Sequence, residues 1–209
     1  MSQESRFVRW AFRVTDLIIV NVLFVICCIP VITVGASVTA MYSITIKMVR
    51  DEEPASMVKG FFRAFRDNFV QSTVIWVILA LFGAALYLDW RIAVSLSQGP
   101  ARSVLTGILI AAVCVWMCIF SYVFALTARF KNTTMEMIRN SFHLSLGNLK
   151  FTVPAVILNL TPLLMIFVPA GWLRWIFLAF FFIWFSAVSY LNSMMLRYLF
   201  DRIAGDGKD

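Results

Sequence analysis

Charged residues and histidine are scarce in this sequence. Asp, Glu, Lys and Arg make up 14% of its 209 residues, and the single histidine is His143. Histidine-based metal sites and Ser-His-Asp hydrolysis therefore lack their parts within the chain. No glycine-rich phosphate loop ending in Gly-Lys-Ser or Gly-Lys-Thr is present, so we expect no ATP hydrolysis. These absences predict a protein that is not an enzyme and holds no cofactor or metal.

Hydrophobic residues dominate the amino-acid composition. They make up 61% of the chain, whereas soluble proteins use about 45–50%. Long apolar stretches cover residues 74–88, 104–126, 151–168 and 175–195. Each is close to the roughly 20 apolar residues that a helix needs to cross a bilayer core about 30 Å thick. We therefore expect an all-α polytopic membrane protein, a transmembrane helical bundle in which residues 1–209 form a single integral membrane domain.

The basic residues indicate which connections face the cytoplasm. Two connections between apolar stretches carry half of the 18 Lys and Arg residues: Lys47, Arg50, Lys59, Arg63 and Arg66 in the first, and Arg129, Lys131, Arg139 and Lys150 in the second. By the positive-inside rule both connections are cytoplasmic. The basic residues that follow residue 195 predict a cytoplasmic C-terminus as well.

The N-terminal apolar run, residues 17–48, is too long for one simple span. Its roughly 32 residues would form a helix of about 48 Å at 1.5 Å per residue. Pro30 and the small residues 35–37 indicate a break, because proline removes a backbone donor and disfavours helix before it. A hairpin at this break predicts six spans with both termini in the cytoplasm. The alternative, one long kinked helix, predicts five.

Two cytoplasmic segments, residues 58–66 and 135–146, combine an apolar stripe with basic residues at helical spacing. We expect each to form an amphipathic helix at the inner membrane surface, with its basic residues toward anionic headgroups. The second has a capping box, Thr133 with Glu136, and a Gly147-Asn148 pair that ends the helix.

The first of these segments is also a candidate docking element for a cytoplasmic partner. Aromatic and basic side chains alternate along it, which provides both an apolar anchor and charged specificity. The candidate docking residues are Phe61, Phe62, Arg63, Phe65 and Arg66.

Polar residues inside the apolar stretches are candidates for function, because they are costly at membrane depth. The candidates are Asn21, Thr39, Tyr42, Ser43, Asn159 and Asn192. None of them is charged, which argues against an ion-driven transporter with a buried carboxylate. Hydrogen bonds between helices are the simplest interpretation of the asparagines. Thr39, Tyr42 and Ser43 provide an alternative, a polar groove for a sugar or peptide ligand.

The N-terminal third carries four segments with a family likeness: residues 30–37 (PVITVGAS), 39–42 (TAMY), 47–53 (KMVRDEE) and 62–68 (FRAFRDN). They resemble the YesL-like integral membrane proteins of Gram-positive bacteria, a domain of unknown function. The resemblance extends over essentially the full length, with the later spans matching mainly in hydropathy. It implies a bacterial plasma-membrane protein often encoded beside carbohydrate ABC importers, and it implies no established activity or catalytic residue.

On this basis the leading expectation is a non-enzymatic accessory or permease-like subunit associated with carbohydrate ABC uptake. Two alternatives stay open: an autonomous oligomeric small-solute transporter, and a membrane-bound regulator of a transport system. The expected partners are the lipid bilayer, ABC importer subunits or further copies of the chain, and not nucleic acid.

Overall fold

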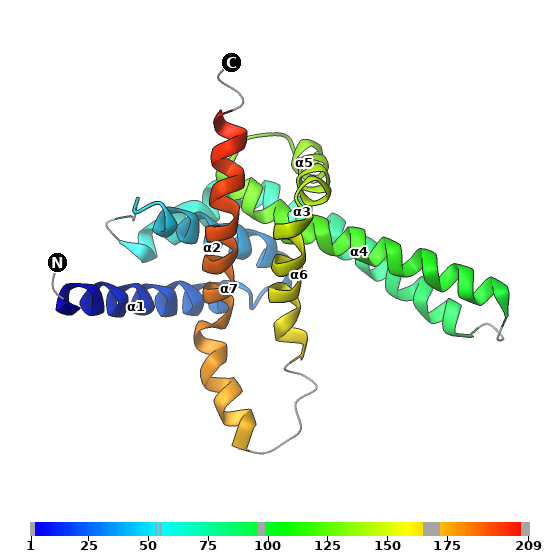
Figure 1. Ribbon diagram of the computed structural model, residues 1–209, viewed down its shortest axis with the longest axis horizontal. Helices are drawn as coiled ribbons and strands as arrows, with labels where there is room; N and C mark the ends of the chain where they lie inside the picture. The colour runs from blue at the N-terminus through cyan, green and yellow to red at the C-terminus, as the bar shows by residue number, and fades with distance from the viewer. Residues whose placement is uncertain (1–2, 53, 55, 96–98, 165–171, 206–209) are drawn as a thin grey trace.

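In the computed structural model, residues 3–52, 54, 56–95, 99–164 and 172–205 are described, and every regular element within them is helical (Figure 1). The elements are α1 (Gln3–Cys27), the 3-10 turn η1 (Val31–Thr33), α2 (Val34–Val49), α3 (Met57–Ser95), α4 (Pro100–Arg129), α5 (Thr134–Gly147), α6 (Leu149–Leu164) and α7 (Trp172–Gly205). The all-α prediction is confirmed for this part of the chain.

The N-terminal apolar run breaks at Pro30, as predicted. α1 ends at Cys27, and the chain resumes as α2 after η1. The hydroxyl of Thr33 donates to the carbonyl oxygens of Cys27 and Pro30, which supplies partners to carbonyls that the end of a helix leaves unpaired. The run is therefore two helices and not one continuous kinked helix. The expected loose stretch at residues 35–37 is wrong, because these residues are helical and buried in the first turn of α2.

Gly35 explains why this stretch is buried. A Cβ at this position would lie 2.4 Å from the carbonyl oxygen of Ser72 and 2.6 Å from the Cβ of Trp76, both on α3. Glycine thus lets the backbones of α2 and α3 approach closely, as small residues do at helix contacts in membranes. Beside this contact, the hydroxyl of Ser72 donates to that of Thr39 at 2.8 Å. α2 and α3 are consequently joined by both close packing and a buried hydrogen bond.

α3 corrects the prediction of a separate surface helix at residues 58–66. It is one helix of 39 residues, about 58 Å long at 1.5 Å per residue, and these residues are its first turns. Phe61 and Ala64 are buried in a cluster with side chains of α1 and α2, so the apolar stripe packs against protein. The amide of Asn68 donates to the carbonyl of Ala64 in the same helix, and the helix continues past it.

The second amphipathic segment does form a helix of its own, α5. Its capping box is confirmed: the amide of Thr133 donates to the Glu136 carboxylate at 2.9 Å, and the amide of Glu136 donates to the Thr133 hydroxyl. The donated hydrogen bond from Thr133 holds the pKa of Glu136 below its usual value. The helix ends at Gly147 with Asn148 as its C-cap, as predicted.

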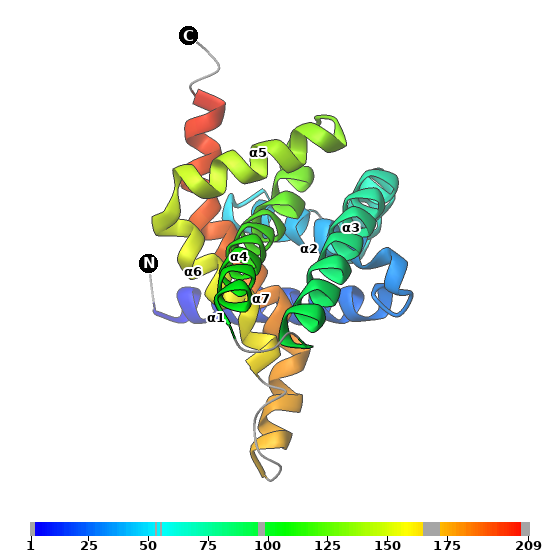
Figure 2. The same ribbon diagram turned by 90° about the vertical axis from the view of Figure 1, so that its right-hand side faces the viewer.

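The helices do not lie parallel to one another. α2 packs against α1, α3, α4 and α7 at the centre of the fold. In both views α1 runs across α7 and not along it, and the α3–α4 pair points away from the lower half of the α6–α7 pair (Figures 1 and 2). The fold is therefore two diverging hairpins, α3–α4 and α6–α7, joined through α2, and not a bundle of parallel spans.

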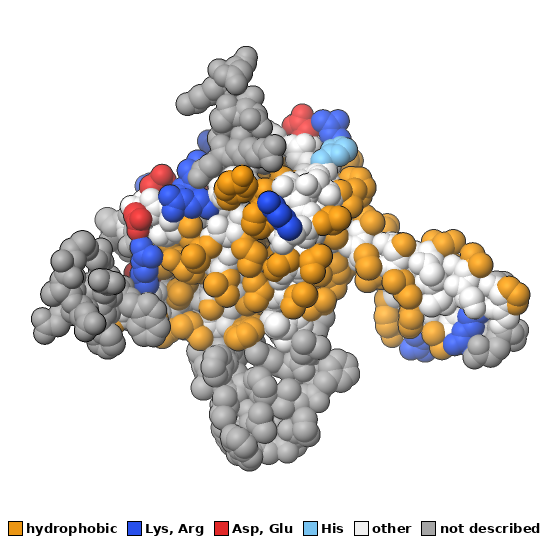
Figure 3. Space-filling model, in the orientation of Figure 1, with side chains coloured by type: hydrophobic (Ala, Val, Ile, Leu, Met, Phe, Trp, Pro, Cys, Tyr) orange, Lys and Arg blue, Asp and Glu red, His pale blue; other side chains and the backbone are white. Residues whose placement is uncertain are grey.

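Length and hydropathy support membrane helices. Among the described residues, three helical stretches are long and apolar enough to cross a bilayer: Val31–Val49, Met57–Ser95 and Arg102–Arg129. The apolar stretch Leu149–Thr161 is shorter. In Figure 3, hydrophobic side chains cover the middle of the face, while charged side chains gather along its upper edge and near the far end of the α3–α4 pair. This pattern is compatible with a membrane protein.

The Gly35 contact yields a stability prediction. Gly35→Ala should lower the stability of the protein in detergent by about 1–3 kcal/mol, the usual cost of overpacking, because the new methyl group meets backbone atoms of α3. Gly107→Ala is the matched control, since a Cβ at Gly107 of α4 meets nothing within 4 Å, and it should be neutral or slightly stabilising. Thermal unfolding of the two purified variants measures both; equal melting temperatures would contradict the proposed close approach.

Candidate functional site

The centre of the fold contains a cavity of about 320 Å³ where α1, α2, α3, α4, α6 and α7 meet. We call it the central cavity. Its lining is mostly apolar and includes six Phe and Trp side chains: Phe24, Trp76, Trp116, Phe120, Phe124 and Phe185. Tyr42, Asn159 and Ser189 supply polar groups to the same walls. Its volume lies at the lower end of the range for small-molecule sites, roughly 300–1,000 Å³, and such sites commonly combine apolar walls with a few polar groups.

Trp116 forms a rigid part of this wall. Its indole N–H donates to the carbonyl oxygen of Leu79 on α3 at 3.0 Å. Gly83, one turn further along α3, leaves room for the ring, because a Cβ there would lie 3.1 Å from the Trp116 ring. Phe120 packs beside it, with the ring centroids 5.6 Å apart. The aromatic face is thus held in place by α3 before any ligand binds.

A chain of hydrogen bonds lies behind the polar part of the cavity. The side-chain amide of Asn192 donates to the Tyr42 hydroxyl at 3.1 Å and to the Asn159 amide oxygen at 3.2 Å. The Asn159 amide in turn donates to the Ser121 hydroxyl at 3.1 Å. These four residues belong to α7, α2, α6 and α4, so this polar cluster joins both hairpins to α2.

One acceptor in the polar cluster has no partner. Asn192 is 1% exposed, and its amide oxygen makes no hydrogen bond within the described part of the chain. An unpaired buried acceptor costs about 1–3 kcal/mol. A hydroxyl or amide donor reaching this oxygen would recover that cost, so the polar cluster favours a ligand or water that donates hydrogen bonds.

Two further polar candidates, Asn21 and Thr39, make hydrogen bonds between helices. The Asn21 side-chain oxygen accepts from the backbone amide of Ser186 on α7 at 3.0 Å, and Thr39 pairs with Ser72 on α3. All three candidate asparagines therefore make hydrogen bonds between helices. Thr39, Tyr42 and Ser43 do not line one groove: Tyr42 lines the central cavity, Thr39 is fully buried, and Ser43 lines a different, polar groove.

Sequence reasoning singled out Ser186 and Ser189 as polar residues at membrane depth, but it missed Thr45, Ser193 and Ser121. The hydroxyl of Thr45 lies 2.9 Å from those of Ser189 and Ser193, which joins α2 to α7. Ser121 completes the polar cluster. The available signal was the polar stripe on α7, where Ser186, Ser189 and Ser193 recur at helical spacing.

The candidate docking residues do not share one exposed face. Phe61 is fully buried, which corrects its assignment as a docking residue, and Phe65 is half-buried beside the same cluster. Phe62, Arg63 and Arg66 are exposed. Arg63 lines the groove that also contains Ser43, whereas Phe62 and Arg66 are not part of its lining.

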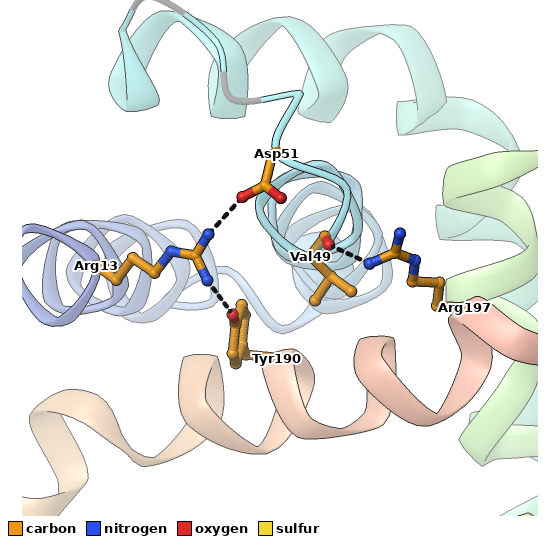
Figure 4. A network of polar contacts seen from close by, with 5 residues as sticks. All are labelled: Arg13, Val49, Asp51, Tyr190 and Arg197. Carbon is orange, nitrogen blue, oxygen red and sulfur yellow. Dashed lines mark hydrogen bonds and ion pairs between the residues drawn. The ribbon is translucent and has the colours of Figure 1, made fainter. Parts of the chain in front are cut away.

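A separate polar network joins α1 and α7 to the C-terminal end of α2 (Figure 4). Arg13 of α1 pairs with Asp51, just after α2, and donates to the Tyr190 hydroxyl of α7 at 3.0 Å. Arg197 of α7 donates to the carbonyl of Val49 at 3.0 Å. Asp51 has a φ of 57°, a left-handed conformation that Asp tolerates better than most residues. The network stabilises the turn after α2, and it contains no group arranged for catalysis.

Comparison with known proteins finds a matching family model and a similar protein. The model of a family described as "Protein of unknown function, DUF624" matches residues 17–90. The "Uncharacterized protein YesL" of Bacillus subtilis (strain 168) is 23% identical over 154 residues, which cover 74% of this chain and 69% of YesL. The YesL-like resemblance is confirmed. No solved structure matches the chain. The matched residues 17–90 include Tyr42, the Gly35 contact and Trp76, while the remaining members of the polar cluster lie outside them.

The polar cluster can be tested by a double-mutant cycle. Tyr42→Phe and Asn192→Ala each remove one side of their hydrogen bond, so we expect their effects on stability to be non-additive by about 0.6 kcal/mol, the average for hydrogen bonds inside a membrane protein. Tyr42→Phe combined with Ser95→Ala, at the far end of α3, should be additive. Unfolding of the purified variants in detergent gives the coupling energies, and a zero coupling between Tyr42 and Asn192 would rule out the bond.

Proposed function

We propose that this chain is a non-enzymatic, multi-pass protein of the bacterial plasma membrane that binds a small polar solute in the central cavity, as a permease-like or accessory subunit of carbohydrate ABC uptake. The observation that carries the proposal is the composition of the cavity, which combines several aromatic side chains with the polar groups of Tyr42 and Asn159. Sugars have apolar ring faces and many hydroxyl donors, which this combination suits. The association with carbohydrate import comes from the YesL-like resemblance.

The topology that belongs to this proposal has six spans, with five as the alternative, and both termini in the cytoplasm. Its support is the clustering of basic residues before α3 and between α4 and α6, together with the helix break at Pro30. In this topology α5 and the first turns of α3 lie at the inner membrane surface. The docking surface reduces to Phe62 and Arg66, which are exposed.

One observation favours the alternative of an autonomous transporter. The central cavity is lined by residues of a single chain, so binding a solute requires no second subunit. An accessory subunit and an autonomous transporter therefore differ in whether the exposed side of α3 contacts an importer, and not in whether the cavity binds solute. A regulator would bind solute or importer without moving solute across the membrane.

Solute binding is the first test. Small sugars should change the tryptophan fluorescence of the purified full-length protein, because Trp76 and Trp116 line the cavity. Asn159→Ala should weaken the binding about tenfold, by removing a hydrogen bond worth about 0.5–1.5 kcal/mol. Asn140→Ala, on α5 and away from the cavity, is the matched control and should bind like the parent protein. A panel of mono- and disaccharides that leaves the fluorescence of the parent protein unchanged would count against the proposal.

Partner contact is the second test. If the chain is an accessory subunit, importer components should co-purify with it in mild detergent, and Phe62→Ala should weaken the association by about 1–3 kcal/mol, as for an interface anchor. Phe82→Ala is the matched control, since Phe82 lies on the same helix and is similarly exposed, 50% against 47%. Unchanged recovery with Phe62→Ala, in a preparation that still binds sugar, would favour the autonomous transporter.

A further inference from the structure

A polar groove at the ends of α2, α3 and α4 is separate from the central cavity. It has a volume of about 1,150 Å³ and extends along the linker into α5. We call it the basic groove, after four residues that line it: Lys47, Arg63, Arg129 and Lys131. They come from α2, α3, the end of α4 and the linker, so the fold gathers positive charge here from segments far apart in the sequence.

The positive charge of the basic groove is not neutralised locally. Two carboxylates line it, Asp67 and Glu136, and within the described residues neither makes an ion pair with any of the four cations. The Glu136 carboxylate accepts a hydrogen bond from the backbone amide of Thr133 in the capping box of α5. All four cations are exposed. Like charges held in one hollow repel each other, and an anion placed between them relieves that repulsion.

The groove continues into an exposed apolar face of α3. Starting from Arg63 and Asp67, the residues at spacings of three and four are Val70, Val74, Ile78 and Leu81. Residues at these spacings share one side of a helix. The four apolar side chains are 74%, 44%, 41% and 67% exposed. One side of α3 is therefore charged over its first turns and apolar over the following turns, with no described part of the chain covering it.

We propose that the basic groove binds the phosphate of an anionic phospholipid, whose acyl chains lie along the apolar side of α3. Arginine side chains suit this role because the guanidinium group can donate two parallel hydrogen bonds to phosphate oxygens. The adjoining apolar face selects a lipid over the other anions that the groove could attract, because a free phosphate ion or an acidic peptide makes no use of it. This site is independent of solute binding in the central cavity.

The test uses the full-length protein in mild detergent, titrated with dioleoyl phosphatidylglycerol or dioleoyl phosphatidylcholine, with bound lipid measured by native mass spectrometry. We expect phosphatidylglycerol to bind at least tenfold more tightly than phosphatidylcholine. Arg63→Gln should weaken phosphatidylglycerol binding about fivefold, the effect expected for one basic residue at a membrane surface. Lys131→Gln lies in the linker, outside any helix, and should have a similar effect without the risk of disturbing α3.

Arg91→Gln is the matched control. It removes the same charge from an exposed position on the same helix, near the opposite end, and should leave lipid binding unchanged. Bound phosphatidylglycerol should also raise the melting temperature of the parent protein and of Arg91→Gln, with a smaller rise for Arg63→Gln and Lys131→Gln.

Four results would overturn the proposal. Equal binding of the two lipids would show no selection for an anionic headgroup, and an equal loss in Arg91→Gln would show only general attraction by net charge. Inorganic phosphate that binds as tightly as the lipid would identify a soluble phosphate as the ligand. An octaglutamate peptide that binds more tightly than the lipid, and loses its binding in Arg63→Gln, would identify an acidic protein segment as the occupant.

Discussion

The burial of α2 is the constraint on which the rest of the fold depends. Twelve of its 16 residues are buried, and several of these carry hydroxyl groups. A polar group away from water must find a partner, because leaving it unpaired costs free energy. Thr45 finds its partners on α7 and Thr39 on α3. These two hydroxyls therefore specify which helix lies beside each of them and in which register, while Gly35 sets how closely α3 approaches.

The central cavity follows from this arrangement. α2 holds α3 through a close backbone contact and the Thr39–Ser72 hydrogen bond, and it holds α7 through the hydrogen bonds of Thr45. Large aromatic side chains of α3 and α4 face the gap between the hairpins, and rings held rigidly, such as Trp116, cannot rearrange to fill it. The polar cluster closes the other side. A hollow lined by aromatic side chains and a few polar groups is the result of packing bulky residues around a helix that is bonded to two neighbours.

Features that depend on local sequence could be predicted, and those that depend on distant contacts could not. Pro30 breaks the N-terminal run and Thr133 caps α5, because both effects act within a few residues. The stripe containing Phe61 has the same spacing whether it faces lipid or protein, so its burial against α1 and α2 was not visible. Gly35 was mistaken for a loop residue, since a glycine that permits close packing looks identical in sequence to one that permits a turn.

The candidate site could be predicted only in part. Its polar residues could be recognised individually, but the pairing of Asn192 with Asn159 depends on how the helices pack.

α3 explains why residues 58–66 have the amphipathic pattern of a surface helix although they belong to a much longer, mostly apolar helix. Its buried side, with Phe61, Ser72 and Ile75, packs against the core. Its opposite side changes from charged to apolar at Val70. A helix of 39 residues exceeds the thickness of a bilayer core by roughly half its length, so charged turns and a long apolar stretch fit into one helix without any break. The amphipathic pattern of residues 58–66 is therefore that of the first turns of a long helix, whose one side packs against protein.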